Sequence, residues 1–430
     1  MKKPKNYLKQ VRNQYESYPY PPRKPEEERQ RLIRVVLSEL APIHHYCFRG
    51  RRRLEGLNVL VAGAGTGDAT IFLAEQLSLV GGRVTSLDIS EASSRVAKGR
   101  AKVRGLDNID WVHASLLDLP ELGLGPFDYI NCTGVLHHLE DPDAGLLALK
   151  SVLKDDGAMG IMLYGTYGRA GVYQMQDMLR LINQDERDME GCVKNAKAAV
   201  DTVPPTHWLR HNQNLLEDLE EDIGVYDLLL HSHDRSYTVH QLYDFVAGAG
   251  LHFGGFAYPV NRLRMDPVLN VTDKRLLQRI QRLSQRDRDA VMEIWSGIIL
   301  RHTFYITAQP DTAARPEELD LVPYLFGAPY DFARGFAGQL ANAPKGKPVT
   351  WQQQGAFLSV VPGTYSARIL MQIDGNRTLR QVFDRVRAEA GGKAPTDEKL
   401  LANFLPVWEA FNRMDFMLLR DPSVPPIADV

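Results

Sequence analysis

Cysteine is scarce in this chain, and its scarcity argues against two kinds of site. Only three cysteines occur in 430 residues, Cys47, Cys132 and Cys192. They lie far apart, and their spacing fits neither a zinc site nor a disulfide framework. We therefore expect a reducing compartment, no structural disulfide and no metal.

The sequence also lacks a long apolar run and a large excess of charge. No stretch reaches the roughly 20 apolar residues that a membrane-spanning helix needs. The basic residues 1–5 are followed by polar residues and not by the apolar core of a signal peptide. The formal net charge of −2 gives no argument for a polyanionic partner. We expect a cytoplasmic protein that binds neither a membrane nor nucleic acid.

Glycine, in contrast, is concentrated at one informative point. An apolar strand over residues 57–62 leads directly to Gly63, Gly65 and Gly67, and a helix-forming segment over residues 68–77 follows. Glycine allows the chain to turn sharply out of a strand and to approach a ligand with bare backbone, and the first N–H groups of the helix then face that ligand. This strand, loop and helix predict a nucleotide-cofactor site.

Two cofactor classes compete for this loop. The dinucleotide-binding fingerprint needs a third glycine at the position that Asp68 occupies. The observed spacing instead resembles motif I of the class I S-adenosylmethionine-dependent methyltransferases. A second strand over residues 83–88 ends in Asp88, where a carboxylate can bind the ribose hydroxyls of S-adenosylmethionine or of NAD.

Two later segments separate the classes. Residues 108–120 resemble the third strand and adenine loop of these methyltransferases, and residues 127–142 closely resemble their fourth strand and loop. A helix over 144–153, a turn over 154–157 and a strand over 158–164 continue the order of the family. The resemblance implies an α/β fold, a Rossmann-like seven-stranded methyltransferase sheet with helices on both faces.

The end of the same sheet is expected further along the chain. Residues 237–251 predict a helix with Thr238 near its start, and residues 253–258 and 302–308 predict the last two strands. Between these strands, residues 272–299 are typical of a charged amphipathic helix that packs on the outside or forms a dimer contact. A homodimer is therefore one candidate oligomeric state.

The resemblance assigns cofactor and catalytic roles to individual residues. The glycine loop would flank the methionine half of S-adenosylmethionine, Asp88 would bind the ribose, and Ser115 with Leu116 would hold the adenine. His137 and His138 follow the strand that borders the methyl group, and they are candidate bases or parts of the pocket wall. The candidate cofactor-binding residues are Gly63, Ala64, Gly65, Thr66, Gly67, Asp68, Asp88, Ile89, Ser115, Leu116, Cys132 and Gly134.

Two segments outside the sheet are candidates for the acceptor site. Residues 1–55 contain a proline-stiffened arm around Tyr18 and a predicted helix over about 25–40, and the arm either folds over the cofactor or packs outside. An insertion over about 165–236 is long enough to form a lid or a binding element, although its end can also be an ordinary turn and helix cap. The candidate substrate residues are Tyr18, Tyr164, Arg169, Tyr173, His231, Asp234 and Arg235.

We divide the chain into an N-terminal arm and helix (1–55), a methyltransferase domain (56–310), a linker (311–344) and a small winged-helix-like domain (345–430). In the last part we expect a hairpin, three helices and a closing strand. Residues 373–383 resemble part of the small PqqD-like peptide-binding domains, and a helical unit for dimer contacts is the alternative.

The resemblance implies a methyltransferase that passes the sulfonium methyl group of S-adenosylmethionine to a nucleophile by an SN2 reaction, and we expect a small-molecule acceptor. The alternative is methylation of a protein or peptide, with the C-terminal domain as the docking module. A cofactor-binding protein without catalysis and a Rossmann oxidoreductase are further alternatives from other classes.

Overall fold

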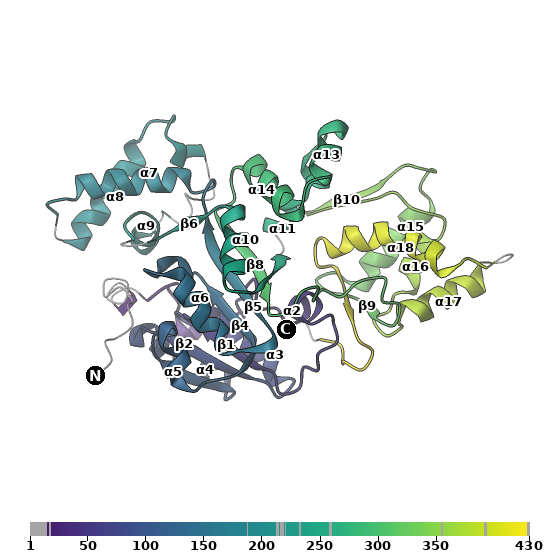
Figure 1. The fold of residues 1–430 in the computed structure, drawn as a ribbon, viewed down its shortest axis with the longest axis horizontal. Coiled ribbons are helices and arrows are strands. Elements are labelled where there is room, and N and C mark those ends of the chain that lie inside the picture. Colours follow the sequence, from purple (N-terminus) through teal and green to yellow (C-terminus); the bar gives the residue numbers. More distant parts are fainter. Residues whose placement is uncertain are drawn as a thin grey trace.

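The computed structural model describes residues 15–16, 19–186, 188–211, 215, 219, 221–231, 234–257, 260–353, 356–390 and 394–427. Figure 1 shows the insertion near one end of the long axis of the molecule and the C-terminal unit near the other. Within the described residues, no helix has both the length and the apolar composition that crossing a membrane requires.

A mixed sheet forms the centre of the molecule. In spatial order its strands are β3 (Ile109–His113), β2 (Arg83–Asp88), β1 (Asn58–Ala62), β4 (Phe127–Thr133), β5 (Leu153–Gly165), β8 (Arg301–Thr307) and β7 (His252–Phe256). The first five are parallel, and β8 is antiparallel to both its neighbours. The short β6 (Ser236–Tyr237) pairs with the end of β5. The predicted sheet is confirmed, and its strand order reverses beside β1, where open α/β sheets bind ligands.

Successive side chains of the sheet face two different apolar cores. In β1, Val59 and Val61 face one core, whereas Leu60 and Ala62 face the other, because neighbouring residues of a strand point to opposite faces. The first core is covered by α2 (Leu40–Cys47), α3 (Asp68–Ser78) and α4 (Glu91–Arg104), and the second by α6 (Pro142–Lys150), α10 (Val239–Gly248) and α14 (Gln285–Ser296). Helices therefore cover both faces, as predicted.

The later helices also follow the sequence pattern. Thr238 caps α10 by accepting a hydrogen bond from the backbone N–H of Gln241, whose side chain accepts one from Thr238 in return. The charged stretch forms α13 (Lys274–Gln281) and α14, after α11 (Val260–Met265) and α12 (Pro267–Asn270). The hydroxyl of Tyr243 on α10 donates to Asp289 on α14 at 2.7 Å, so α14 packs on the outside of the sheet domain.

The helix predicted over residues 25–40 is wrong. Only a short 3₁₀ helix, Pro25–Arg29, forms there, and the chain is irregular until α2. The carbonyl oxygen of Leu37 instead accepts hydrogen bonds from the Tyr129 hydroxyl at 2.7 Å and from the Asn131 amide at 3.1 Å, both on β4. These bonds hold Leu37 in a left-handed conformation, with φ of 68°, and override local helix propensity.

The turn predicted over residues 154–157 is a bulge inside β5. Phe127 pairs with Leu153, but Tyr129 pairs with Ala158, so the residues between the two pairs loop out. The polar residues Lys154 to Gly157 do interrupt the regular strand pairing, as predicted, but β5 already begins before them, at Leu153.

The insertion folds into a helical layer of its own. It contains α7 (Ala170–Ile182), α8 (Met189–Thr202), a 3₁₀ helix (Trp208–His211) and α9 (Asp222–Leu229). A separate apolar core holds these helices together, with Val172, Met175, Leu179, Leu209 and Val225 among its buried members. The layer follows the carboxyl end of β5 directly, which brings it to the ligand-binding edge of the sheet.

The C-terminal unit is larger than predicted. It consists of β9 (Val322–Leu325), α15 (Tyr330–Ala341), β10 (Val349–Gln353), β11 (Ala356–Val360), α16 (Ser366–Gln372), α17 (Leu379–Glu389), α18 (Asp397–Asn412) and β12 (Met417–Arg420). The hairpin, the three helices and the closing strand are confirmed. The linker is wrong for residues 322–341, because β9 pairs with β12, and Phe336 and Leu340 of α15 are buried in the core of this unit.

Buried polar side chains join this unit to α2. The ring nitrogen Nδ1 of His45 accepts a hydrogen bond from the backbone N–H of Leu419 at 3.0 Å, and the Tyr46 hydroxyl donates to Asp415 at 2.7 Å. Arg262 forms an ion pair with the same Asp415. The C-terminal unit is thus fixed against the sheet domain by directional contacts.

Acid is expected to weaken this junction. Burial lowers the pKa of His45 from 6.5 to about 3, so at pH 5 the unfolded chain binds a proton that the folded chain does not. The stability that neutral His45 contributes is fully present above pH 6.5 and is lost as the pH is lowered. At pH 5 the free energy of unfolding is smaller by about 2 kcal/mol than at neutral pH. Denaturant unfolding at pH 7.5 and at pH 5 measures this loss in each protein. Between the two pH values, the free energy of unfolding of His45→Gln should fall by about 2 kcal/mol less than that of the wild type. Equal losses in the two proteins would contradict the prediction.

Candidate functional site

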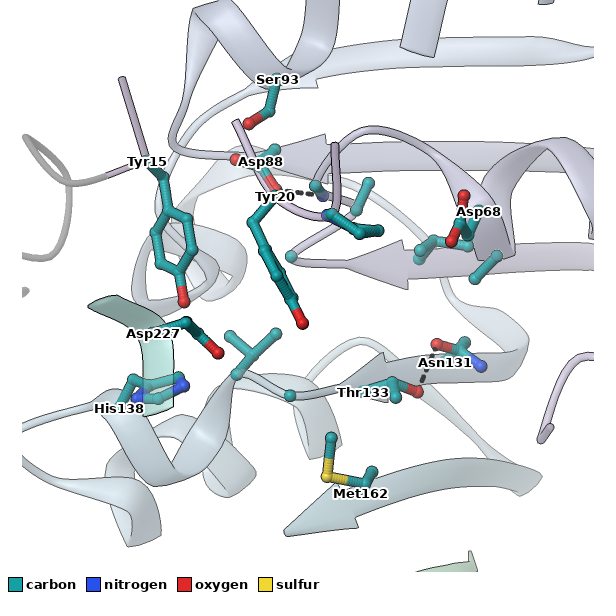
Figure 2. A pocket seen from close by; sticks show the side chains of 18 of the residues that line it. Tyr15, Tyr20, Asp68, Asp88, Ser93, Asn131, Thr133, His138, Met162 and Asp227 are labelled. Atoms are coloured by element: carbon teal, nitrogen blue, oxygen red, sulfur yellow. Dashed lines mark hydrogen bonds between the residues drawn. The ribbon is translucent and has the colours of Figure 1, made fainter. Parts of the chain in front are cut away.

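A cavity of about 430 Å³ lies at the carboxyl ends of the central parallel strands. The glycine loop, the N-terminal arm and the insertion all contribute to its walls. Figure 2 shows Tyr15 and Tyr20 of the arm on one side of this space, and Thr133 and Met162 of the strand ends on the other. The predicted cofactor loop and the predicted acceptor segments therefore share one cavity.

The glycine loop is closely packed on its outer side. Gly65 has a φ of +54°, and a Cβ atom there would lie 2.7 Å from the carbonyl oxygen of Tyr20 in the arm. Gly67 has a φ of +100°, and its Cβ would lie 2.7 Å from the Cβ of Ala97 on α4. Both positions therefore require glycine for space as well as for backbone conformation. The inner side of the loop, at Gly63 and Gly65, lines the cavity.

Asp88 holds this loop in place from the end of β2. Its carboxylate accepts hydrogen bonds from the backbone N–H of Gly65 at 2.6 Å and from that of Ser90 at 2.8 Å. Burial raises the pKa of Asp88, and the two backbone hydrogen bonds oppose that shift. Each carboxylate oxygen has a further lone pair, so Asp88 can also accept hydrogen bonds from the hydroxyls of a ribose in the cavity.

The N-terminal arm is bound to the loop and to α4. The Thr66 hydroxyl donates to the carbonyl oxygen of Pro21 at 2.7 Å, and the backbone N–H of Thr66 donates to that of Tyr20 at 3.3 Å. At the start of α4, the Glu16 carboxylate accepts from the backbone N–H of Glu91 at 2.7 Å. The arm therefore lies over the cavity, and the alternative of an arm packed elsewhere on the domain is wrong.

Asp68 lines the cavity, but its carboxylate is already bound by two arginine side chains. Arg23 of the arm binds both of its carboxylate oxygens, at 2.9 and 2.7 Å, and Arg100 of α4 binds it at 2.6 Å. Burial raises the pKa of Asp68, but the Arg23 hydrogen bond and the Arg100 charge lower it overall. Arg23 itself also lines the cavity, next to the start of α3.

Most of the candidate cofactor residues line the cavity, namely Gly63, Ala64, Gly65, Asp68, Asp88, Ile89, Ser115, Leu116 and Gly134. Three others do not. The hydroxyl of Thr66 is bound by the arm, and Gly67 packs against α4. Cys132 lies in the apolar core because alternation along β4 turns Asn131 and Thr133, and not Cys132, toward the cavity. Direct cofactor contact by the Cys132 side chain is therefore wrong.

The two candidate bases occupy different environments. His138 lines the cavity, whereas His137 is fully buried behind it, with its ring 3.8 Å from the ring of Tyr164. Burial lowers the pKa of His137 well below its usual range, and the charge of Arg169 adds to this effect. The buried neutral ring of His137 packs behind the wall of the cavity, so its assignment as a catalytic residue is corrected. His138, which lines the cavity, is the histidine that an acceptor there can contact.

The candidate substrate residues divide in the same way. Tyr164 and Arg169 line the cavity, and Tyr18 lies outside the described residues. The other four candidates are not among the residues that line it: they are Tyr173, His231, Asp234 and Arg235. The ring of His231 stacks on that of His138 at 3.9 Å. The assignment of these four as acceptor contacts is corrected, because none of them lines the cavity. His231 and Asp234 contact residues of the wall, whereas Arg235 is exposed.

The comparisons with known proteins agree with the geometry. A family model described as a methyltransferase domain matches residues 60–159. An uncharacterized protein of a Synechococcus species is 32% identical over 300 residues, which are 69% of this chain and 70% of that protein. The chain belongs to the class I S-adenosylmethionine-dependent methyltransferases. S-Adenosylmethionine is accordingly its cofactor.

Two further similarities extend this result. The ubiquinone biosynthesis O-methyltransferase of Xanthomonas euvesicatoria is 27% identical over 186 residues, 43% of this chain and 73% of that protein. The structure of PKMT2 from Rickettsia typhi in complex with AdoHcy has a TM-score of 0.60 at 18% identity, and the match covers 90% of this chain and 75% of that one. The fold that the two proteins share therefore extends beyond the sheet domain of this methyltransferase.

Sequence reasoning missed several polar residues of the cavity. Asn131 and Thr133 of β4 both line it, and their alternation with apolar residues in a buried strand was a usable signal. Asp227 of α9 and Arg301 at the start of β8 also line it. Neither stands in a recognisable motif, because the cavity brings together elements that are far apart in the chain.

Arg169→Ala is expected to destabilise the methyltransferase. The side chains of Arg169 and Asp234 are 3% and 1% exposed and lie 3.2 Å apart, so the change leaves a buried carboxylate without its cation, at a cost of about 3–5 kcal/mol. Arg169→Met combined with Asp234→Asn removes both charges and should recover most of that loss in thermal unfolding. Equal destabilisation in the single and double variants would contradict this interpretation.

Proposed function

We propose that this methyltransferase transfers a methyl group to the nucleophile of a small molecule, which enters the cavity between His138 and the insertion. The supporting observation is the size and closure of the cavity. At about 430 Å³ it is near the lower end of the usual range for ligand pockets, about 300–1,000 Å³. With the cofactor in place, the remaining space suits a small acceptor or the reacting end of a larger one.

The cofactor assignments follow from the side chains that line the cavity. Asp88 would bind the ribose, the backbone at Gly63 and Gly65 would flank the methionine half, and Ser115 would border the adenine. Arg23, held by Asp68, is a cation for the carboxylate of the methionine half. S-Adenosylmethionine supplies an electrophilic methyl group on a positively charged sulfur. The residues of the chain align the acceptor with that methyl group and exclude water, since the arm and insertion cover the cavity.

Calorimetry and labelling test this function. The full-length protein should bind S-adenosylmethionine and S-adenosylhomocysteine but not NAD. With tritiated S-adenosylmethionine, label should enter the fraction of a cell extract that passes a small-molecule cutoff. Label confined to larger material that protease removes would favour a protein acceptor, and label removed by nuclease would favour a nucleic acid.

A protein or peptide acceptor is the second candidate, and the C-terminal hairpin favours it. Strands β10 and β11 pair with each other and with no other described strand. The side chains of Phe357 and Val361, in and just after β11, are 38% and 52% exposed. A two-stranded sheet with open edges can accept an extended peptide as a further strand. Phe357→Lys should then reduce labelling of large acceptors and leave S-adenosylhomocysteine binding unchanged.

A further inference from the structure

The segment that contains helix α13 carries charge of one sign only. Residues 274–286 include five cationic side chains and no aspartate or glutamate. They are Lys274, Arg275, Arg279, Arg282 and Arg286. The formal net charge of −2 belongs to the whole chain and does not describe this segment. Figure 1 shows α13 projecting at the upper edge of the molecule, away from the strands of the central sheet.

Three of the arginines lie on one face of the helix. Arg275, Arg279 and Arg282 are four and three residues apart, which is the spacing of neighbours on a helix surface. All three residues are exposed. The helix packs against the core of the sheet domain with other side chains, namely the buried Ile280 and the partly buried Leu277. The arginine face is therefore turned toward solvent.

No acidic side chain pairs with this face. Arg286, just beyond it, is paired with Asp244 at 2.9 Å. Within the part of the chain that the structure describes, the side chains of Arg275, Arg279 and Arg282 form no ion pair. Like charges at these spacings destabilise a helix, and Arg275 lies in the first turn, where the helix dipole disfavours a cation. An anionic partner would relieve both effects.

Exposed apolar side chains accompany the arginines. Leu276 and Leu283 are 37% and 39% exposed, and they are seven residues apart, which is about two helical turns. On α14, Ile294 and Trp295 are 58% and 51% exposed. Cations beside leucine and tryptophan are typical of a surface that lies on an anionic bilayer. There the cations contact the headgroups and the apolar side chains enter between them.

Two other occupants fit this face less well. A second copy of the chain, related by a two-fold axis, would bring the same patch against itself, and the arginines of the two copies would repel each other. A nucleic acid would use the arginines through its phosphates. However, α13 contains no aromatic ring on which a base could stack, and a phosphate backbone gains little from exposed leucines.

We propose that this face of α13 binds the surface of a membrane that contains anionic lipids. Arg275, Arg279 and Arg282 bind the headgroup phosphates, and Leu276 and Leu283 enter the boundary between headgroups and acyl chains. Each arginine contributes about fivefold to the affinity. The proposal depends neither on the methyl acceptor nor on the cavity, which lies at the carboxyl ends of the central strands.

Co-sedimentation of the full-length protein with lipid vesicles tests this surface. Vesicles of phosphatidylcholine with about one third phosphatidylglycerol should bind the protein, and pure phosphatidylcholine vesicles should not, because the arginines need anionic headgroups. Raising the salt concentration from about 0.05 to 0.5 M should weaken binding. Combining Arg275→Gln, Arg279→Gln and Arg282→Gln should weaken it about a hundredfold, while glutamine keeps the helix propensity.

A second variant tests the apolar contribution. Leu276→Ser combined with Leu283→Ser leaves the charge unchanged and should weaken vesicle binding at least about tenfold, because the serines bury less apolar surface in the bilayer. Vesicle binding that is unchanged in this variant would contradict the insertion of the leucines. Binding to poly(U) RNA that needs the three arginines, without binding to anionic vesicles, would show that the partner is a nucleic acid and would overturn the proposal.

The matched control removes the same charge from another helix. Arg95, Lys98 and Lys102 are exposed on α4, and changing all three to glutamine should leave vesicle binding as in the wild type. Equal losses in the two triple variants would indicate attraction by overall charge and would overturn the assignment to α13. A wild-type protein that does not sediment with anionic vesicles would do the same. Calorimetric binding of S-adenosylhomocysteine verifies that each variant is folded.

Discussion

Gly65→Val is expected to abolish measurable binding of S-adenosylhomocysteine while the protein remains folded. A valine Cβ would lie 2.7 Å from the Tyr20 carbonyl oxygen, in a backbone conformation with a φ of +54°. The left-handed conformation costs a non-glycine residue roughly 1–2 kcal/mol, and the clash displaces the arm that covers the cavity. A branched side chain in this loop also restricts the backbone that faces the cofactor.

Gly81→Val separates these causes. Gly81 has a φ of +67°, and a Cβ there would have no neighbour within 4 Å, so this variant carries the backbone strain without the clash. It should lose some thermal stability and bind S-adenosylhomocysteine normally in calorimetry. If Gly65→Val bound as well as Gly81→Val, the glycine loop would not be part of the cofactor site.

The sheet and the cofactor loop were predictable because their signals are local. The glycine spacing, the carboxylate at the end of β2 and the polar loop after β4 each lie within a few residues of the strand that places them. The capping residues Thr238 and Thr378 mark the starts of their helices in the same way. Such features depend on backbone chemistry that neighbouring residues decide.

The errors arose where distant residues decide the outcome. The carbonyl oxygen of Leu37 accepts hydrogen bonds from side chains of β4 and not from a helix backbone. His137 and His138 are adjacent and identical in the sequence, yet only His138 lines the cavity, whereas His137 is fully buried against the ring of Tyr164. Asp227 acquires its position from the packing of the insertion. No local pattern distinguishes these residues from ordinary helix, loop or surface positions.

Asp88→Ala is expected to weaken S-adenosylhomocysteine binding by more than about tenfold, because hydrogen bonds to a charged group contribute about 1.5–3 kcal/mol each. The change removes the proposed ribose contacts and also the acceptor of the Gly65 N–H at 2.6 Å, so the loop loses its fixed position.

The matched control for this change is Asp110→Ala on the neighbouring strand β3. The side chain of Asp110 is 56% exposed and paired with Arg83, and its removal should leave affinity unchanged. Calorimetry with thermal unfolding of both variants measures affinity and folding separately. A folded Asp88→Ala protein that binds as tightly as the control would remove Asp88 from the cofactor site, and the ribose hydroxyls would need another acceptor in the cavity.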